Sequence, residues 1–189
     1  MGTPEGSGPY LLDDFRDGGD PSALGTRWQG LTDQVMGGIS EMSSRIVETD
    51  RGPALQLQGQ VRLENSGGFI QARLPLTASG EPFDASAWTG VALELRGRPG
   101  PYYLHVRTAD TRRPWQHYRA PLPVGTDWQR VVVPFSGLEP RRLEGPADVQ
   151  RLLSVAVVAY GEAFEPRVEV ARLELVTEAG GTEPVGAPG

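Results

Sequence analysis

The sequence predicts an all-β protein in which two antiparallel sheets pack face to face as a β-sandwich. Apolar and polar residues alternate over short runs such as 91–96 and 102–107, which is typical of a strand with one buried and one solvated face. Glycine or proline bounds most of these runs, and only 146–151 suggests a helical turn. Many strands separated by turn residues favour a sandwich, because both inner faces must be covered and the sheet edges protected.

The strand pattern recurs along the whole middle of the chain. It covers 54–64, 68–74, 91–96, 102–107, 115–120, 128–134, 152–160 and 167–176. The segment 152–160 is apolar at both alternating sets of positions, which predicts a central strand that is buried on both faces. The ends, 1–9 and 177–189, are rich in Gly, Pro, Thr and Glu without an apolar period. We therefore expect one domain at 10–176, preceded by a flexible leader and followed by a disordered tail.

The charge and the residue types argue against several kinds of partner and chemistry. The formal net charge is −6, and all 18 basic residues are arginines, because the chain contains no lysine. The arginines are spread along the sequence without a basic stripe, so electrostatic binding to nucleic acid or to an anionic membrane is not expected. The absence of cysteine excludes disulfides, thiolate nucleophiles and Cys-ligated metal sites.

The sequence carries no pattern for membrane insertion or export. No stretch approaches the roughly 20 apolar residues that are needed to span a bilayer. Residues 1–9 lack the basic start and the apolar core of a targeting signal. We therefore expect a cytoplasmic protein that does not insert into a membrane.

Two short blocks carry the most specific signal. The first is 28–40, and its characteristic residues are Trp28, Asp33, Met36, Gly37, Gly38 and Ser40. The second is 65–73, and its characteristic residues are Asn65, Gly67, Gly68, Phe69 and Arg73. A tight turn explains paired glycines, which tolerate positive φ, but not the other residue types at fixed offsets. We expect Asp33 to cap the first turn, and an ion pair between Asp33 and Arg73 is a further hypothesis.

Together the two blocks resemble the signature of the complex I intermediate-associated protein 30 family, abbreviated CIA30. A third stretch, 115–120 followed by 128–135, is similar to later strands of that domain, so the resemblance covers 10–176. It implies a jelly roll of the galactose-binding-domain type. It also implies a non-enzymatic, chaperone-like assembly factor that holds immature subunits of a respiratory complex I-type membrane complex. The lone, lysine-free domain resembles a bacterial member of the family.

The usual catalytic motifs are missing from the sequence. Ser40 follows two glycines but lacks the Gly-x-Ser-x-Gly order of a nucleophile turn. A phosphate-binding loop of the Gly-x4-Gly-Lys type is impossible without lysine. We therefore predict no catalytic residue, no cofactor and no enzymatic activity, and an uncharacterised hydrolase stays as a third hypothesis.

Two arrangements leave a metal site open as an alternative. His105 and His117 fall on strands that we expect to be neighbours, where side chains approach to about 5 Å, and Glu94 is the carboxylate placed nearest to them. Asp13 and Asp14 could join a structural calcium site of the kind that some jelly rolls carry. Surface histidines and a solvated acidic pair are the favoured interpretation, so no metal is predicted.

Polar and aromatic residues at alternate positions of several strands predict a shared face. Its candidate residues are Glu94, Tyr103, His105, Arg107, Trp115, His117 and Arg119, with Gln71, Arg73 and Arg96 alongside. One interpretation is a solvated outer sheet with extended arginines. The other is a recognition face, on which aromatic rings offer flat contact area and charged groups make directional bonds. Its partner is then a protein subunit or, alternatively, a carbohydrate, since jelly rolls also hold sugars on such faces.

Overall fold

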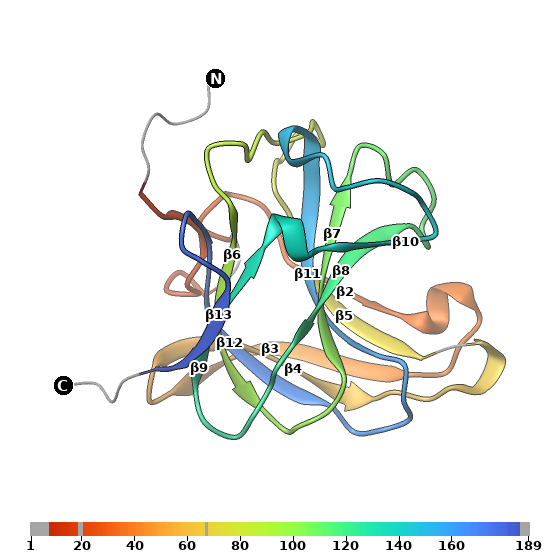
Figure 1. Cartoon of the computed structure of the whole chain (residues 1–189). Helices are drawn as coiled ribbons and strands as arrows, with labels where there is room; N and C mark the ends of the chain where they lie inside the picture. The colour runs from red at the N-terminus through yellow and green to blue at the C-terminus, as the bar shows by residue number, and fades with distance from the viewer. Residues whose placement is uncertain (1–7, 19–20, 67, 186–189) are drawn as a thin grey trace.

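The protein folds as a sandwich of two antiparallel β-sheets (Figure 1), which confirms the predicted fold class. The structure, a computed structural model, describes residues 8–18, 21–66 and 68–185. Sheet A runs in the order β13 (Gly181–Pro184), β9 (Gln129–Pro134), β6 (Gly90–Gly97), β12 (Arg167–Val176), β4 (Gly52–Gln60) and β3 (Glu41–Thr49), and β1 (Tyr10–Asp13) also pairs with β12. Sheet B runs in the order β10 (Glu139–Arg141), β8 (His117–Leu122), β7 (Tyr102–Thr108), β11 (Leu152–Tyr160), β5 (Phe69–Pro75) and β2 (Gln29–Thr32).

The helical elements are single 3₁₀ turns. They are η1 (Asp33–Met36), η2 (Glu64–Ser66), η3 (Phe135–Gly137) and η4 (Val149–Arg151). The last of these lies inside the predicted helical turn at 146–151. In the described part of the chain, no helix has the length and apolar character needed to cross a bilayer.

The core fills the space between the sheets and is built from the alternate positions that the sequence predicts. In β7 the side chains of Tyr102, Leu104 and Val106 are buried in the core, while the residues between them are half-buried on the outer face. β11 is buried along nearly its whole length, because it lies between β7 and β5 at the centre of sheet B. This confirms the prediction of a central strand at 152–160.

In β12 the set of alternate positions that faces the core changes partway along the strand. Val168 and Val170 enter the core before an irregularity in the pairing with β6, and Leu173 and Leu175 enter it afterwards. One extra residue at such a bulge reverses the alternation, since successive side chains point to opposite faces of a strand. The bulge keeps both halves of this long strand packed on sheet B.

The strands β1, β2, β3, β10 and β13 are missing from the sequence-based prediction. All residues of β10 and β13 are exposed, so no apolar alternation marks them. Backbone hydrogen bonds to one neighbour are enough to hold such edge strands. Because β13 pairs with β9, the predicted disorder of 177–189 is wrong over Gly181–Pro184. The remainder of the predicted tail at 186–189, and residues 1–7 of the predicted leader, lie outside the described residues.

Consecutive strands β6 and β7 lie in different sheets. β6 pairs with β9 and β12 in sheet A, whereas β7 pairs with β8 and β11 in sheet B. The connection 98–101 contains Pro99 and Pro101, which have no N–H to donate to a hairpin ladder. The chain therefore crosses the sandwich here, and residues of β6 cannot share an outer face with residues of β7.

Candidate functional site

A buried carboxylate joins the two characteristic sequence blocks. The side chain of Asp33 is 0% exposed. Its Oδ1 accepts a hydrogen bond from the Ser40 N–H at 2.9 Å, and its Oδ2 accepts from the Gly68 N–H at 2.5 Å. Oδ2 also accepts from the Phe69 N–H at 3.3 Å and from the Ser40 hydroxyl. The loop that follows β2 is thereby fastened to the loop that precedes β5.

These hydrogen bonds keep Asp33 ionised although it is buried. Burial favours the neutral carboxyl, but the bonds from the Ser40 hydroxyl and from the backbone of Gly68, Ser40 and Phe69 outweigh it and hold the pKa below the ordinary 3.8. The N-cap of η1 is Thr32, whose side chain accepts from the Gln34 N–H at 3.1 Å. The expectation that the Asp33 side chain caps this turn is therefore wrong. Its carboxylate organises two loops at once.

Steric reasons explain several other residues of the blocks. Gly37 has φ 89° and Gly68 has φ 134°, values at which a side chain is strained. A Cβ atom at Gly38 would collide with the carboxylate of Asp33. Asn65 has φ 58°, a left-handed conformation that asparagine tolerates. The side chain of Met36 and the whole of residue 67 lie outside the described part of the structure.

The remaining residue of the first block, Trp28, binds a second buried acid. Its indole N–H donates to Oδ2 of Asp13 at 2.8 Å, and Oδ1 of Asp13 accepts from the Phe15 N–H at 3.0 Å. Both oxygens of Asp13 therefore have protein donors, while Asp14 pairs with Arg16 at 3.2 Å. Among the residues that the structure describes, no group of three or more His, Asp or Glu could hold a metal ion, so the calcium hypothesis gains no support.

A pocket of about 820 Å³ opens on the outer face of sheet B. Its floor is β11, where Ser154 and Ala156 present small side chains. In the register of the sheet, Ala156 lies between Arg73 of β5 and His105 of β7. Small residues on the central strand therefore leave a space that longer side chains on both neighbouring strands enclose.

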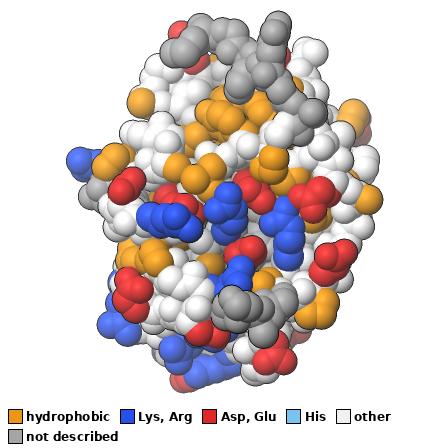
Figure 2. Space-filling model, turned by 90° about the vertical axis from the view of Figure 1, so that its left-hand side faces the viewer, with side chains coloured by type: hydrophobic (Ala, Val, Ile, Leu, Met, Phe, Trp, Pro, Cys, Tyr) orange, Lys and Arg blue, Asp and Glu red, His pale blue; other side chains and the backbone are white. Residues whose placement is uncertain are grey.

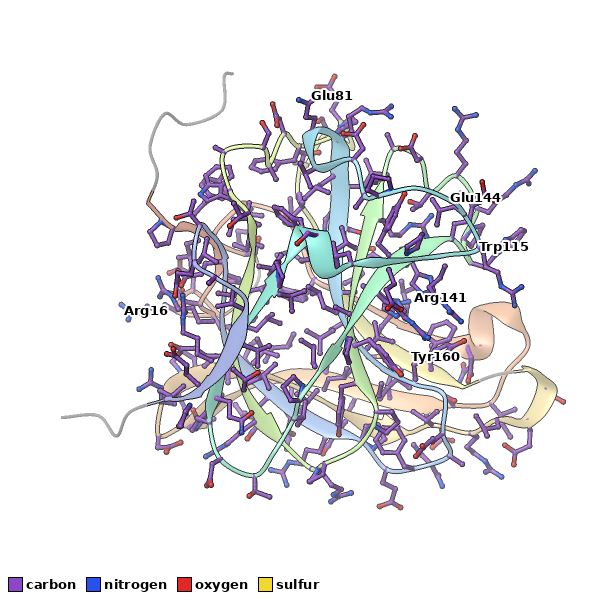
Figure 3. All side chains as sticks on the ribbon, viewed as in Figure 1. Arg16, Glu81, Trp115, Arg141, Glu144 and Tyr160 are labelled. Carbon is purple, nitrogen blue, oxygen red and sulfur yellow. The ribbon has the colours of Figure 1, made fainter. Side chains whose placement is uncertain are left out.

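The lining of this pocket is rich in cations and aromatic rings. Its charged, imidazole and aromatic members are Phe69, Arg73, His105, Arg107, Arg112, Trp115, His117, Arg141, Arg142 and Tyr160. Figure 3 shows Trp115, Arg141 and Tyr160 on the same side of the molecule, beside the strands of sheet B. Trp115 is 53% exposed and Tyr160 is 36% exposed, so both rings offer flat apolar surface to a ligand.

Arg107 holds the loop that forms one rim of the pocket. Its guanidinium donates to the carbonyls of Thr111 at 2.8 Å, Arg113 at 3.1 Å and Pro114 at 3.4 Å. These bonds fix the loop that carries Trp115 over the sheet. Substitution of Arg107 would therefore disturb the loop as well as the charge of the pocket.

His105 and His117 stack face to face, with ring centroids 4.0 Å apart and an interplanar angle of 15°. Nδ1 of His117 lies 3.2 Å from the carbonyl of Trp115, and since a carbonyl only accepts, this nitrogen carries the proton. Burial, helped by repulsion from a protonated His117 and from Arg119 and Arg73, holds the pKa of His105 well below its ordinary value. Burial also lowers the pKa of His117 to about 4. Both imidazoles are therefore neutral at pH 7.

The structure gathers much of the predicted face at the pocket. His105, Arg107, Trp115 and His117 line it, together with Gln71 and Arg73. Arg119 and Tyr103 lie beside it, where the guanidinium carbon of Arg119 is 4.6 Å from the centroid of the Tyr103 ring. Arg73 takes part in no ion pair among the described residues, so the hypothesised pair with Asp33 is not formed.

Glu94 and Arg96 do not belong to this face, which corrects the expectation from the sequence. Both lie on β6 in sheet A, where Glu94 pairs with Arg51 at 3.3 Å and Arg96 pairs with Glu169 at 3.0 Å. The alternation of β6 is the same as that of β7, and alternation does not reveal which sheet a strand joins. The metal site hypothesised at the two histidines thereby loses its carboxylate.

Sequence reasoning misses another part of the pocket. Arg112, Gln116, Arg141, Arg142 and Tyr160 also line it. Arg141 reaches the site because the three-residue strand β10 pairs with β8, opposite His117. Such a strand has no apolar pattern, and the adjacent arginines at 141–142 are the local hint that the sequence offers.

Removal of the Asp33 carboxylate should destabilise the fold strongly. In Asp33→Ala the N–H groups of Ser40, Gly68 and Phe69 lose their acceptor, which we expect to lower the free energy of unfolding at pH 7 by about 3 kcal/mol. Because the folded pKa of Asp33 is depressed, this contribution is complete above the unfolded pKa and is lost as the pH falls through the folded one. Urea unfolding at pH 7 and pH 3 measures both effects. Glu48→Ala, which removes an exposed carboxylate of β3, is the control and should change stability little.

The neutral His117 should make stability depend on pH in a defined window. Its pKa is about 4 when folded and near 6.5 when unfolded, so the unfolded chain binds more protons between these values and stability falls as the pH drops from 6.5 to 4. Protonation of His117 should lower the free energy of unfolding by about 3 kcal/mol over this pH range. In urea unfolding at several pH values, the free energy of unfolding should fall less steeply with decreasing pH in His117→Gln than in the wild type. Equal losses in the two proteins would contradict the buried neutral imidazole.

Several solved structures with the same fold are carbohydrate-binding modules. The family 11 module of the cellulosomal cellulase Lic26A-Cel5E of Clostridium thermocellum matches with a TM-score of 0.72 and 16% identity, over 92% of this chain and 97% of that one. A family 11 module from Clostridium thermocellum, in complex with a β-1,3-1,4-mixed-linked tetrasaccharide, matches with a TM-score of 0.69 and 14% identity, over 94% and 100%. At these identities the likeness shows a shared jelly-roll fold.

The sequence itself matches one protein family. No curated protein matches it significantly. The model of the family described as complex I intermediate-associated protein 30 (CIA30) matches residues 17–159. This region contains both loops that Asp33 joins and most of sheet B. The chain therefore belongs to the CIA30 family.

Proposed function

We propose that this protein is a non-enzymatic binding module that holds a protein partner in the pocket of sheet B. The observation that carries the proposal is the pocket itself, a hollow of about 820 Å³ whose walls combine exposed aromatic rings with arginines. Concave sites of this composition are the usual form of recognition sites. His105 and His117 stack on each other, and Nδ1 of His117 lies against a backbone carbonyl. Within the described residues no serine or carboxylate is bonded to either ring, which supports binding over catalysis.

Membership of the CIA30 family supports a particular kind of partner. The description of the family names an association with an intermediate of complex I. We infer that the partner is a subunit of a multisubunit membrane complex, held before assembly is complete. The protein would then act as a chaperone-like assembly factor in a bacterial cytoplasm, with the loops around Asp33 supporting the edge of the binding face.

Capture from a native lysate tests this function. Subunits of a membrane complex should copurify with the tagged full chain and be identified by mass spectrometry. Trp115→Ala combined with Arg141→Ala removes an exposed ring and an exposed guanidinium from the pocket, and should reduce the captured subunits at least about 10-fold. Arg107 is left intact because it holds the rim loop.

The matched control is Arg16→Ala, which removes an arginine on the opposite side of the molecule (Figure 3). Both variants change exposed side chains, so their free energies of unfolding should stay within about 0.5 kcal/mol of the wild type. Equal capture by the pocket variant and the control would show that the partner binds elsewhere.

Carbohydrate binding is the second candidate function. It is favoured by the exposed rings of Trp115 and Tyr160 at the pocket, in a fold shared with carbohydrate-binding modules. A thermal-shift scan with neutral and acidic oligosaccharides tests it, since a site filled at 100 times its Kd adds about 2.7 kcal/mol of stability. A saturable shift with a neutral glucan, lost in the Trp115 and Arg141 variant, would favour this function over a protein partner.

A further inference from the structure

The arginines on the two outer faces of the sandwich have different partners. On sheet A, Arg96 lies 3.0 Å from both Asp50 and Glu169, and Arg130 lies 2.9 Å from Glu174. Figure 2 shows this side of the molecule, with basic and acidic side chains interspersed. The charges of Arg96 and Arg130 are therefore compensated within the chain.

The pocket of sheet B lacks this compensation. Its lining contains five arginines and no Asp or Glu. These arginines are Arg73, Arg107, Arg112, Arg141 and Arg142, and none of them forms an ion pair in the part of the chain that the structure describes. A protein with a net charge of −6 thus concentrates unpaired positive charge at one hollow.

Arg73 is the member of this group for which the lack of a partner costs most. It is half-buried on β5, beside the floor residue Ala156. Burial and the nearby charge of Arg107 lower its pKa, which means that its surroundings disfavour the cation. Unpaired charges away from water are costly, and an anion placed against the guanidinium would recover that free energy. Arginine is also suited to bidentate contacts with a carboxylate.

The spacing of the arginines indicates the shape of the anion. Arg73 lies on β5 and Arg141 on β10, with β11, β7 and β8 between them. Four strand spacings separate the two backbones by roughly 19 Å. Because side chains stand roughly perpendicular to a sheet, we expect the two guanidinium groups to be too far apart for one carboxylate to contact both. An extended peptide of about six residues covers the same distance and can carry several carboxylates. The exposed ring of Trp115 offers an apolar contact along the way.

We propose that the pocket recognises an acidic, extended segment of the partner protein, whose carboxylates pair with Arg73 at one wall and Arg141 and Arg142 at the other. This assignment rests on the proposed function and specifies its ligand chemistry. The neutral side chains of His105 and His117 line the pocket between Arg73 and the pair Arg141 and Arg142, and add no charge at pH 7. Recognition then depends on charges within the pocket, although the protein as a whole is acidic.

The test uses the full chain and a terminally blocked peptide of six glutamates, with the matching peptide of six glutamines as comparison. The indole N–H signal of Trp115 in NMR spectra reports binding at the pocket. It is distinguishable because the indoles of Trp28, Trp88 and Trp128 donate to Asp13, Gly8 and Asp50, respectively. The glutamate peptide should shift the Trp115 signal saturably and bind at least about 10-fold more tightly than the glutamine peptide, with an affinity that falls as salt rises.

Arg73→Gln combined with Arg141→Gln should weaken glutamate-peptide binding at least about 10-fold, whereas Arg16→Gln should leave it unchanged. Equal binding of both peptides, or no shift of the Trp115 signal with either, overturns the acidic-segment assignment. In that case lysate capture that still depends on the pocket leaves the proposed function standing. Binding of a six-unit galacturonate oligomer without binding of the peptide also overturns the assignment, and moves the ligand to an acidic glycan.

Discussion

The hydrogen bonds to one buried carboxylate set the geometry on which the candidate site depends. Asp33 accepts from the loop that follows it and from the loop that enters β5, two segments far apart in sequence. The first loop follows β2 and the second precedes β5, and these two strands lie at one edge of sheet B. Leu31 of β2 and Phe69 of β5 form part of the pocket wall. A buried ionised group must be hydrogen-bonded, and Asp33 meets this requirement with donors from both segments. The hydrogen bonds to Asp33 therefore hold these two segments together at the edge of sheet B.

The central strand makes the pocket possible. β11 alternates inward-facing valines with outward-facing small residues, Ser154 and Ala156, at the middle of sheet B. The inward residues fill the core, while the outward ones leave room above the sheet. Longer side chains on β5 and β7 then enclose that room, because neighbouring strands lie only about 4.8 Å apart. Packing of the core and the formation of a surface hollow thus come from the two faces of one strand.

Arginine serves two purposes in this lysine-free chain. On sheet A guanidinium groups pair with carboxylates of other strands, as Arg130 of β9 does with the buried Glu174 of β12, across the intervening strand β6. On sheet B they surround a hollow whose lining, among the described residues, contains no Asp or Glu, and Arg107 holds the rim loop through backbone carbonyls. The difference lies in the partners that the fold supplies. Charge that is satisfied internally stabilises the sandwich, and charge that is left unpaired is available to a ligand.

The sequence by itself determined the all-β class, the core alternation, the central strand 152–160 and the family, because these depend on local periodicity and on short motifs. It also identified His105, Arg107, Trp115 and His117, which lie on or beside strands with clear alternation. Only the tertiary structure decided that Glu94 belongs to the other sheet and that Arg141 and Tyr160 complete the pocket. Strand pairing is settled by contacts between residues distant in sequence, and an exposed edge strand such as β10 needs only backbone hydrogen bonds, which leave no mark on its side chains.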